Sequence, residues 1–166
     1  MPTARGTSPP QIAVVGAGDA AAELLTVAEQ VGGGLAEAGA VLVCGGLGGV
    51  MEAACRGARE AGGLTVGLLP GTDRRAANPF VEVVVPTGLG EARNAIVVRA
   101  GEAVIAVGGG YGTLVEIGFA LKAGLSVIGV ATWELSREGR AVDGVERVDT
   151  ATAAVSRALG LARERT

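Results

Sequence analysis

The chain has 166 residues, 49% of them apolar, and a formal net charge of −3 at pH 7. This length suits one domain whose core needs neither disulfides nor metal ions. Scattered basic residues, few aromatic side chains and the lack of a long apolar run argue against nucleic-acid and membrane partners.

Residues 1–10 are expected to form a flexible tail, because they contain no hydrophobic segment of the kind that a signal peptide needs. Cys44 and Cys55 lack the spacing of metal ligands, and we expect reduced thiols in a cytoplasmic protein. The sequence has no histidine, which excludes Ser-His-Asp and Cys-His catalysis and histidine-based metal sites. We therefore expect no metal and no required cofactor.

Apolar runs that predict strands alternate with stretches of helical periodicity. The expected strands are 12–15, 41–44, 64–69, 81–85, 103–107, 126–131 and a short edge strand at 145–148. The expected helices are 21–38, 50–61, 91–100, 113–123 and 150–163. This alternation indicates a parallel sheet that is covered on both faces. Residues 11–166 are thus predicted to form a single α/β domain, a three-layer Rossmann-like fold with a parallel sheet of about seven strands.

Three consecutive glycines, Gly32 to Gly34, fall inside the first predicted helix. Each glycine in a helix interior costs about 1 kcal/mol relative to alanine. Either the helix breaks at this point or a neighbouring element packs very closely against it.

Two glycine loops follow the first two strands. Gly16 and Gly18 fit a G-x-G-x-x-A pattern, and Gly45 and Gly46 begin a second loop that leads into a helix at Met51. The second strand ends without the acidic residue that a dinucleotide-binding fold uses to hold ribose, which argues against NAD or FAD. No G-K-[ST] follows any of the glycines, so a P-loop is excluded as well. Tight turns alone also explain such glycines.

The third loop is more specific, because it combines Gly109, Gly110 and Gly112 with Thr113 and Glu116. A strand that ends in glycines before a helix predicts an anion site made of backbone N–H groups. The nearby carboxylate of Glu116 opposes an anion, so it is expected to contact another part of the ligand. The alternative is a capping box, in which Glu116 pairs with Thr113 at the helix start.

Arg93 is the remaining candidate. It is expected in the first turn of a helix that follows a strand, on the same rim as the three glycine loops. A cation at a helix N-terminus opposes the helix dipole, so its position points to an anionic ligand. The alternative is a surface arginine paired with Glu91 or another acid, and Arg99 is expected to be such a structural residue.

These motifs together resemble the LOG family, whose members were long labelled lysine decarboxylases and which includes molybdenum cofactor carrier proteins. In cytokinin-activating LOG enzymes a nucleoside 5′-monophosphate is hydrolysed to free base and ribose 5-phosphate. The resemblance implies Arg93 and Glu116 as a catalytic pair. The ligand-binding residues that we expect are Gly16, Gly18, Gly45, Gly46, Met51, Gly109, Gly110, Gly112 and Thr113.

Two positions depart from the family motif: Gly108 stands where the hydrolases have proline, and Asn94 where they have lysine. Both are more typical of the carrier branch. The leading hypothesis is therefore a LOG or carrier-type protein that binds an AMP-like nucleotide or a phosphorylated pterin, with the molybdenum cofactor as a candidate ligand. An active phosphoribohydrolase is the alternative.

A lysine decarboxylase is disfavoured, because Lys122 is the only lysine and lies three turns beyond the glycine rim. The helix after Thr113 is apolar around most of its circumference, from Leu114 to Leu121. Family resemblance implies a homodimer or larger homo-oligomer through this helix, whereas burial in a monomer core is the alternative.

Overall fold

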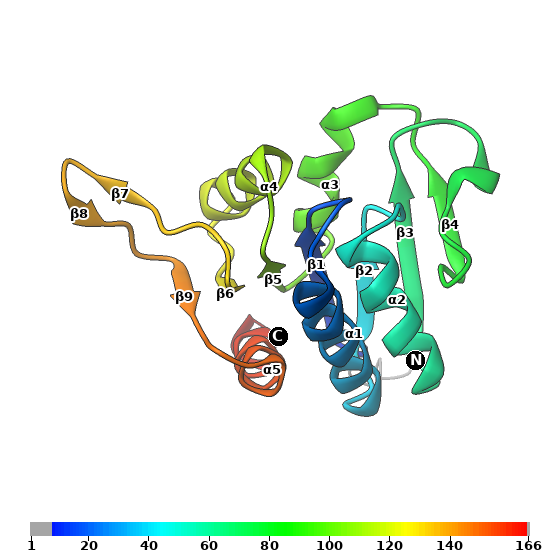
Figure 1. Ribbon diagram of the computed structural model, residues 1–166, viewed down its shortest axis with the longest axis horizontal. Helices are drawn as coiled ribbons and strands as arrows, with labels where there is room; N and C mark the ends of the chain where they lie inside the picture. The colour runs from blue at the N-terminus through cyan, green and yellow to red at the C-terminus, as the bar shows by residue number, and fades with distance from the viewer. Residues whose placement is uncertain (1–7, 166) are drawn as a thin grey trace, which may run out of the picture.

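The seven strands of one sheet are all parallel in the computed structural model, which describes residues 8–165 (Figure 1). Their spatial order is β4-β3-β2-β1-β5-β6-β9. The strands are β1 (Gln11–Gly16), β2 (Val41–Cys44), β3 (Thr65–Leu69), β4 (Val83–Pro86), β5 (Ala103–Val107), β6 (Val127–Val130) and β9 (Val145–Arg147). The predicted tail falls mostly outside the described residues.

Helices cover both faces of this sheet. One face carries α1 (Ala22–Glu37), α2 (Val50–Glu60) and α5 (Ala151–Arg165), and the other carries α3 (Asn94–Arg99) and α4 (Tyr111–Lys122). Within β1, Ile12 and Val14 lie in the first core, whereas Ala13 and Val15 lie in the second. Because successive side chains of a strand point to opposite faces, a strand that is apolar throughout fills both cores. The predicted three-layer α/β fold is confirmed.

Helix α1 runs without a break through the three glycines. A Cβ atom at Gly32 would lie 1.9 Å from the carbonyl oxygen of Ala54 in α2, and one at Gly57 would lie 2.0 Å from the carbonyl oxygen of Glu29. Each helix thus presents a glycine to the backbone of the other. Close packing of a neighbour, rather than a helix break, explains why glycine stands at position 32.

Two parts of the chain differ from the predicted elements. The helix expected at 91–100 divides into a 3₁₀ turn, η2 (Gly90–Arg93), and the short α3. A small antiparallel hairpin, β7 (Ser136–Arg137) and β8 (Arg140–Ala141), was not predicted. Its four paired residues are exposed, so they carry no apolar alternation by which a strand could be recognised. A second 3₁₀ turn, η1 (Arg74–Ala76), lies in the loop before β4.

Strand β1 lies between β2 and β5, so the helices that follow β1 and β5, α1 and α4, lie on opposite faces of the sheet. Such a switch opens a crevice at the carboxyl ends of the two strands, where ligands of open α/β sheets bind. Among residues 8–165, no helix combines the length and apolar composition that a membrane crossing requires.

Candidate functional site

A cavity of about 280 Å³ lies in this crevice. Its lining comes from the loop after β1, the start of α2, the η2–α3 junction and the start of α4. It is formed by Gly16, Ala17, Gly18, Met51, Arg93, Asn94, Gly110, Gly112, Thr113 and Glu116. Eight of the eleven candidate residues therefore come together around one cavity, and three glycines do not line it: Gly45, Gly46 and Gly109.

Those three glycines shape the surroundings of the cavity instead. A Cβ atom at Gly45 would lie 2.8 Å from Nη2 of Arg93, and one at Gly109 would lie 2.4 Å from Oγ1 of Thr113. Gly46 has a positive φ of 76°, and a Cβ there would lie 2.9 Å from the side chain of Leu69. Gly45 and Gly109 thus leave room for side chains that reach the cavity, whereas Gly46 is a packing residue.

The third glycine loop presents a row of unused donors. Among residues 8–165, the backbone N–H groups of residues 109–113 donate no hydrogen bond. The first backbone hydrogen bond of α4 is donated by the N–H of Leu114 to the carbonyl of Gly110. Unpaired N–H groups are usual at a helix start, and here they extend to the two glycines before it. Gly108 and Gly109 have φ values of +55° and +116°, which favour glycine. The loop can therefore offer several N–H groups to an anion.

The capping-box interpretation of Thr113 and Glu116 is wrong. Helix α4 begins at Tyr111 with Gly110 as its N-cap, and no side chain caps it. Glu116 consequently lies in the second turn, where it is only 8% exposed and accepts no hydrogen bond from the described residues. Its carboxylate is available to the cavity rather than to the helix start.

Arg93 is buried, with 7% of its surface exposed. Its Nη2 donates to the carbonyl of Gly45 at 3.4 Å, its Nη1 donates to Oδ1 of Asn94, and its Nε has no partner. Among residues 8–165 no ion pair joins it to Glu91 or to another acid, which contradicts the alternative of a surface pair. The sequence predicts Arg93 in the first turn of a longer helix, but it lies at the end of η2 instead. A buried guanidinium with an unpaired N–H group is unusual and suits an anionic ligand.

Glu116 and Arg93 influence each other without forming an ion pair. Burial raises the pKa of the Glu116 carboxyl to about 7, and the positive charge of Arg93 opposes this rise. Burial likewise lowers the pKa of Arg93, which Glu116 partly restores. A carboxyl group with a pKa near neutrality can give or take a proton at physiological pH.

Three residues that support the loops were not predicted as site residues. The N–H of Asn78 donates to the carbonyl of Gly46 at 2.9 Å and its Nδ2 to that of Leu47 at 2.9 Å. Thr132 and Trp133 hold the third loop in a similar way, as described below. All three belong to irregular segments, and their partners are more than twenty residues away in sequence, so no local pattern marks them.

Among residues 8–165, no three His, Cys, Asp or Glu side chains lie close enough to share a metal ion.

The first two glycine loops contact each other directly, because the N–H of Val50 donates to the carbonyl of Ala17 at 3.0 Å.

Comparison with known proteins identifies relatives of this arrangement. The molybdenum cofactor binding protein of Rippkaea orientalis is 32% identical, with a TM-score of 0.84 over 94% of this chain and 99% of that one. The Moco carrier protein of Chlamydomonas reinhardtii is 33% identical, with a TM-score of 0.83 over 96% and 100% of the two chains. An uncharacterized protein of Archaeoglobus fulgidus is 49% identical over 117 residues, which are 70% of this chain and 77% of that protein.

The predicted resemblance to the LOG and carrier branch is thereby confirmed at the level of the family. The model of the SLOG cluster4 family matches residues 9–157, and these residues include the whole cavity. The chain belongs to the SLOG cluster4 family.

Proposed function

We propose that this protein binds a phosphorylated small molecule, with the phosphate on the third glycine loop. The observation that carries the proposal is the row of free N–H groups at residues 109–113, three of which, Gly110, Gly112 and Thr113, line one cavity with a buried arginine whose Nε is unpaired. Neutral amides and one guanidinium together suit a phosphate dianion, because charge-assisted hydrogen bonds are strong and the helix start favours negative charge.

The ligand classes in this proposal are a nucleoside 5′-monophosphate and a phosphorylated pterin. The two solved relatives that bind or carry the molybdenum cofactor cover nearly all of this chain, which supports that cofactor as cargo. Both ligand classes present the same phosphate dianion, so the donors of the loop fit either of them. The absence of an acidic residue after β2, where dinucleotide-binding folds hold ribose, supports a ligand other than NAD or FAD.

Replacing Arg93 by alanine is expected to weaken AMP binding about ten- to 150-fold, because a hydrogen bond to a charged group contributes about 1.5–3 kcal/mol. Isothermal titration calorimetry with AMP measures the change. Arg99→Ala is the matched control, because Arg99 lies one and a half turns later in the same segment, is exposed and does not line the cavity. Equal AMP affinity in wild type and Arg93→Ala would contradict the proposed phosphate site.

A phosphoribohydrolase is the second candidate, and the buried carboxyl of Glu116 favours it. Cleavage of an N-glycosidic bond develops positive charge on the ribose, which a carboxylate stabilises, and a group with a pKa near 7 can activate water. The phosphate on the loop would then place the ribose next to this carboxylate.

Gly108 supports binding over hydrolysis. Its φ is +55°, and a proline, as in the hydrolase motif, has φ fixed near about −65°. The loop therefore enters the site by a backbone path that the hydrolase motif cannot follow. A Cβ at this position would also lie 2.6 Å from the side chain of Leu24.

Incubation of the purified protein with AMP distinguishes the two candidates. We expect AMP to bind without release of adenine. Chromatography of the free base measures that release. Steady adenine release that Glu116→Gln abolishes would replace the binding function by the hydrolase. Asp19→Asn is a suitable control for that assay, because it changes an exposed carboxylate of the first loop that does not line the cavity.

We also propose that the protein forms a homodimer or larger homo-oligomer through the face formed by α3 and α4. Ile96, Val115 and Tyr111 are 42%, 50% and 81% exposed on this face, so the apolar circumference of α4 is not fully covered within one chain. Sedimentation velocity is expected to show an oligomer in the wild type and a monomer in Val115→Glu. A monomeric wild type would contradict the proposed assembly.

A further inference from the structure

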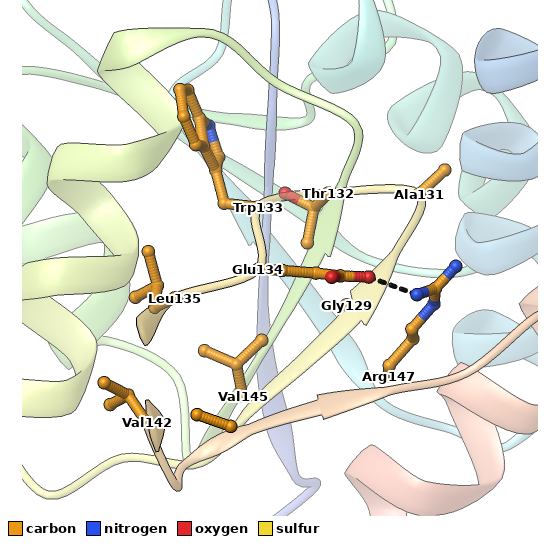
Figure 2. Close-up of a pocket in the computed structure, with 10 residues that line it drawn as sticks. Gly129, Ala131, Thr132, Trp133, Glu134, Leu135, Val142, Val145 and Arg147 are labelled. Carbon is orange, nitrogen blue, oxygen red and sulfur yellow. Dashed lines mark hydrogen bonds and ion pairs between the residues drawn. The ribbon is translucent and has the colours of Figure 1, made fainter. Parts of the chain in front are cut away.

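Two side chains behind the third glycine loop hold its carbonyl groups. The hydroxyl of Thr132 donates to the carbonyl of Gly108, and Nε1 of Trp133 donates to the carbonyl of Gly110 at 3.0 Å. Figure 2 shows both side chains on the segment that leaves β6, directly after Ala131. Tyr111 lies beside Trp133, with ring centroids 5.8 Å apart.

Neither Thr132 nor Trp133 lines the site cavity. They line a separate cavity of about 230 Å³, and the two cavities share no residue. Any influence of these side chains on a bound phosphate must therefore pass through the loop that they hold.

The geometry of the peptide unit says how this influence acts. The described chain has no cis peptide bond, and in a trans peptide the C=O and N–H groups point in opposite directions. When Thr132 holds the Gly108 carbonyl, the N–H of Gly109 points away from Thr132. The Gly110 carbonyl accepts from both Trp133 and the N–H of Leu114, and these two bonds together turn the N–H of Tyr111 out of the start of α4.

We infer that Thr132 and Trp133 are positioning residues that hold the third glycine loop so that its unpaired N–H groups, including those of Gly109 and Tyr111, are available to the ligand phosphate. This inference rests on the proposed function, because it takes the phosphate to lie on the third loop. The glycines need such support: Gly108, Gly109 and Gly110 have no side chains that restrict their own backbone.

The backbone before Thr132 is consistent with this role. Ala131 has a φ of +49°, a conformation that costs energy for any residue with a side chain. This residue turns the chain at the end of β6, so that the next two side chains both reach the loop. Strain of this kind persists only where the surrounding contacts maintain it.

The test compares AMP affinity in Thr132→Val, Thr132→Ser and Trp133→Phe by isothermal titration calorimetry. Valine keeps the shape of threonine without its donor, serine keeps the donor, and phenylalanine keeps an aromatic ring beside Tyr111 without the indole N–H. Loss of one neutral hydrogen bond is expected to weaken AMP binding about three- to tenfold in Thr132→Val and Trp133→Phe. Thr132→Ser is expected to retain most of the wild-type affinity.

Thr87→Val is the matched control, because the hydroxyl of Thr87 donates to the carbonyl of Leu69 at 2.7 Å and Thr87 lies outside the site cavity. It is expected to lower the melting temperature without changing AMP affinity. Amide NMR spectra give a second measurement: inorganic phosphate should shift the Gly109 and Tyr111 signals in the wild type, and less so in Thr132→Val and Trp133→Phe.

Wild-type AMP affinity in folded Thr132→Val and Trp133→Phe would overturn this inference and leave the proposed function intact. Failure of the wild type to bind AMP or inorganic phosphate would overturn both. An equal loss in Thr132→Val and Thr132→Ser would also overturn it, because serine preserves the donor that the inference requires.

Discussion

Replacing Gly32 by alanine is expected to lower the free energy of unfolding by about 3 kcal/mol. The added methyl group would lie 1.9 Å from the carbonyl oxygen of Ala54, which is a backbone atom and cannot rotate away as a side chain can. The two helices must therefore separate. Their N-termini follow the first and second glycine loops, so the separation also disturbs the contact between Ala17 and Val50.

Gly57→Ala tests the same contact from the other helix. Its methyl group would lie 2.0 Å from the carbonyl oxygen of Glu29, and a similar loss of stability is expected. One movement of the helices relieves both clashes, so the double variant Gly32→Ala/Gly57→Ala is expected to lose less than the sum of the two single losses.

Gly33→Ala is the matched control in the same helix. The nearest neighbouring atom would lie 3.7 Å from its Cβ, an ordinary contact, so alanine is expected to raise stability by about 1 kcal/mol through helix propensity. Urea unfolding followed by circular dichroism measures all four variants. Equal effects of Gly32→Ala and Gly33→Ala would show that the α1–α2 contact does not require glycine.

The layers of the fold could be predicted from the sequence because the patterns that mark buried strands and helices are both local. Buried parallel strands such as 103–107 are apolar at every position, and the helices between them repeat with their own period. The close α1–α2 approach was one of two open explanations for Gly32. A choice between them depends on Gly57 and Ala54, which lie in another helix, and no local pattern relates these positions.

The candidate site was predictable where its residues follow strands directly. Gly16, Gly110 and Thr113 line one cavity because the carboxyl ends of parallel strands meet at one edge of the sheet. The helix start was wrong by two residues, because the spacing of Thr113 and Glu116 matches a capping box in any helix that begins at Thr113. Where α4 begins depends on the position of Gly110 relative to the carboxyl end of β5.

The supporting residues were not predictable for a different reason. Asn78, Thr132 and Trp133 act through single side-chain bonds to backbone carbonyls in other loops. A hydrogen bond of this kind needs one donor at one place and leaves no periodicity in the sequence. Such residues become visible only when the loops are placed in space.

Glu116→Gln is expected to raise the free energy of unfolding at pH 8 by about 3 kcal/mol relative to the wild type. Burial raises the pKa of this carboxyl from its ordinary value of 4.5 to about 7. The folded protein must therefore carry a buried charge above pH 7, whereas the glutamine variant carries none. A destabilising group that is kept at a cavity is typical of a functional site.

The direction of the pH dependence follows from proton binding. Below pH 4.5 the Glu116 carboxyl is protonated in both states and costs nothing. Between pH 4.5 and about 7 the unfolded chain loses this proton while the folded protein keeps it, so wild-type stability falls as pH rises. Above about pH 7 both states are ionised and the loss is complete.

The difference in unfolding free energy between Glu116→Gln and the wild type isolates this titration, and urea unfolding from pH 5.5 to 8.5 measures it. The sequence has no histidine, so no other side chain with an ordinary pKa titrates in the middle of this range. We expect the difference to grow steadily with pH and to level off above about pH 7.5. A difference that is independent of pH would mean that Glu116 is ionised in the folded protein throughout. Its carboxylate would then repel the phosphate at every pH, and a ligand group with a positive charge or a hydroxyl would have to lie between them.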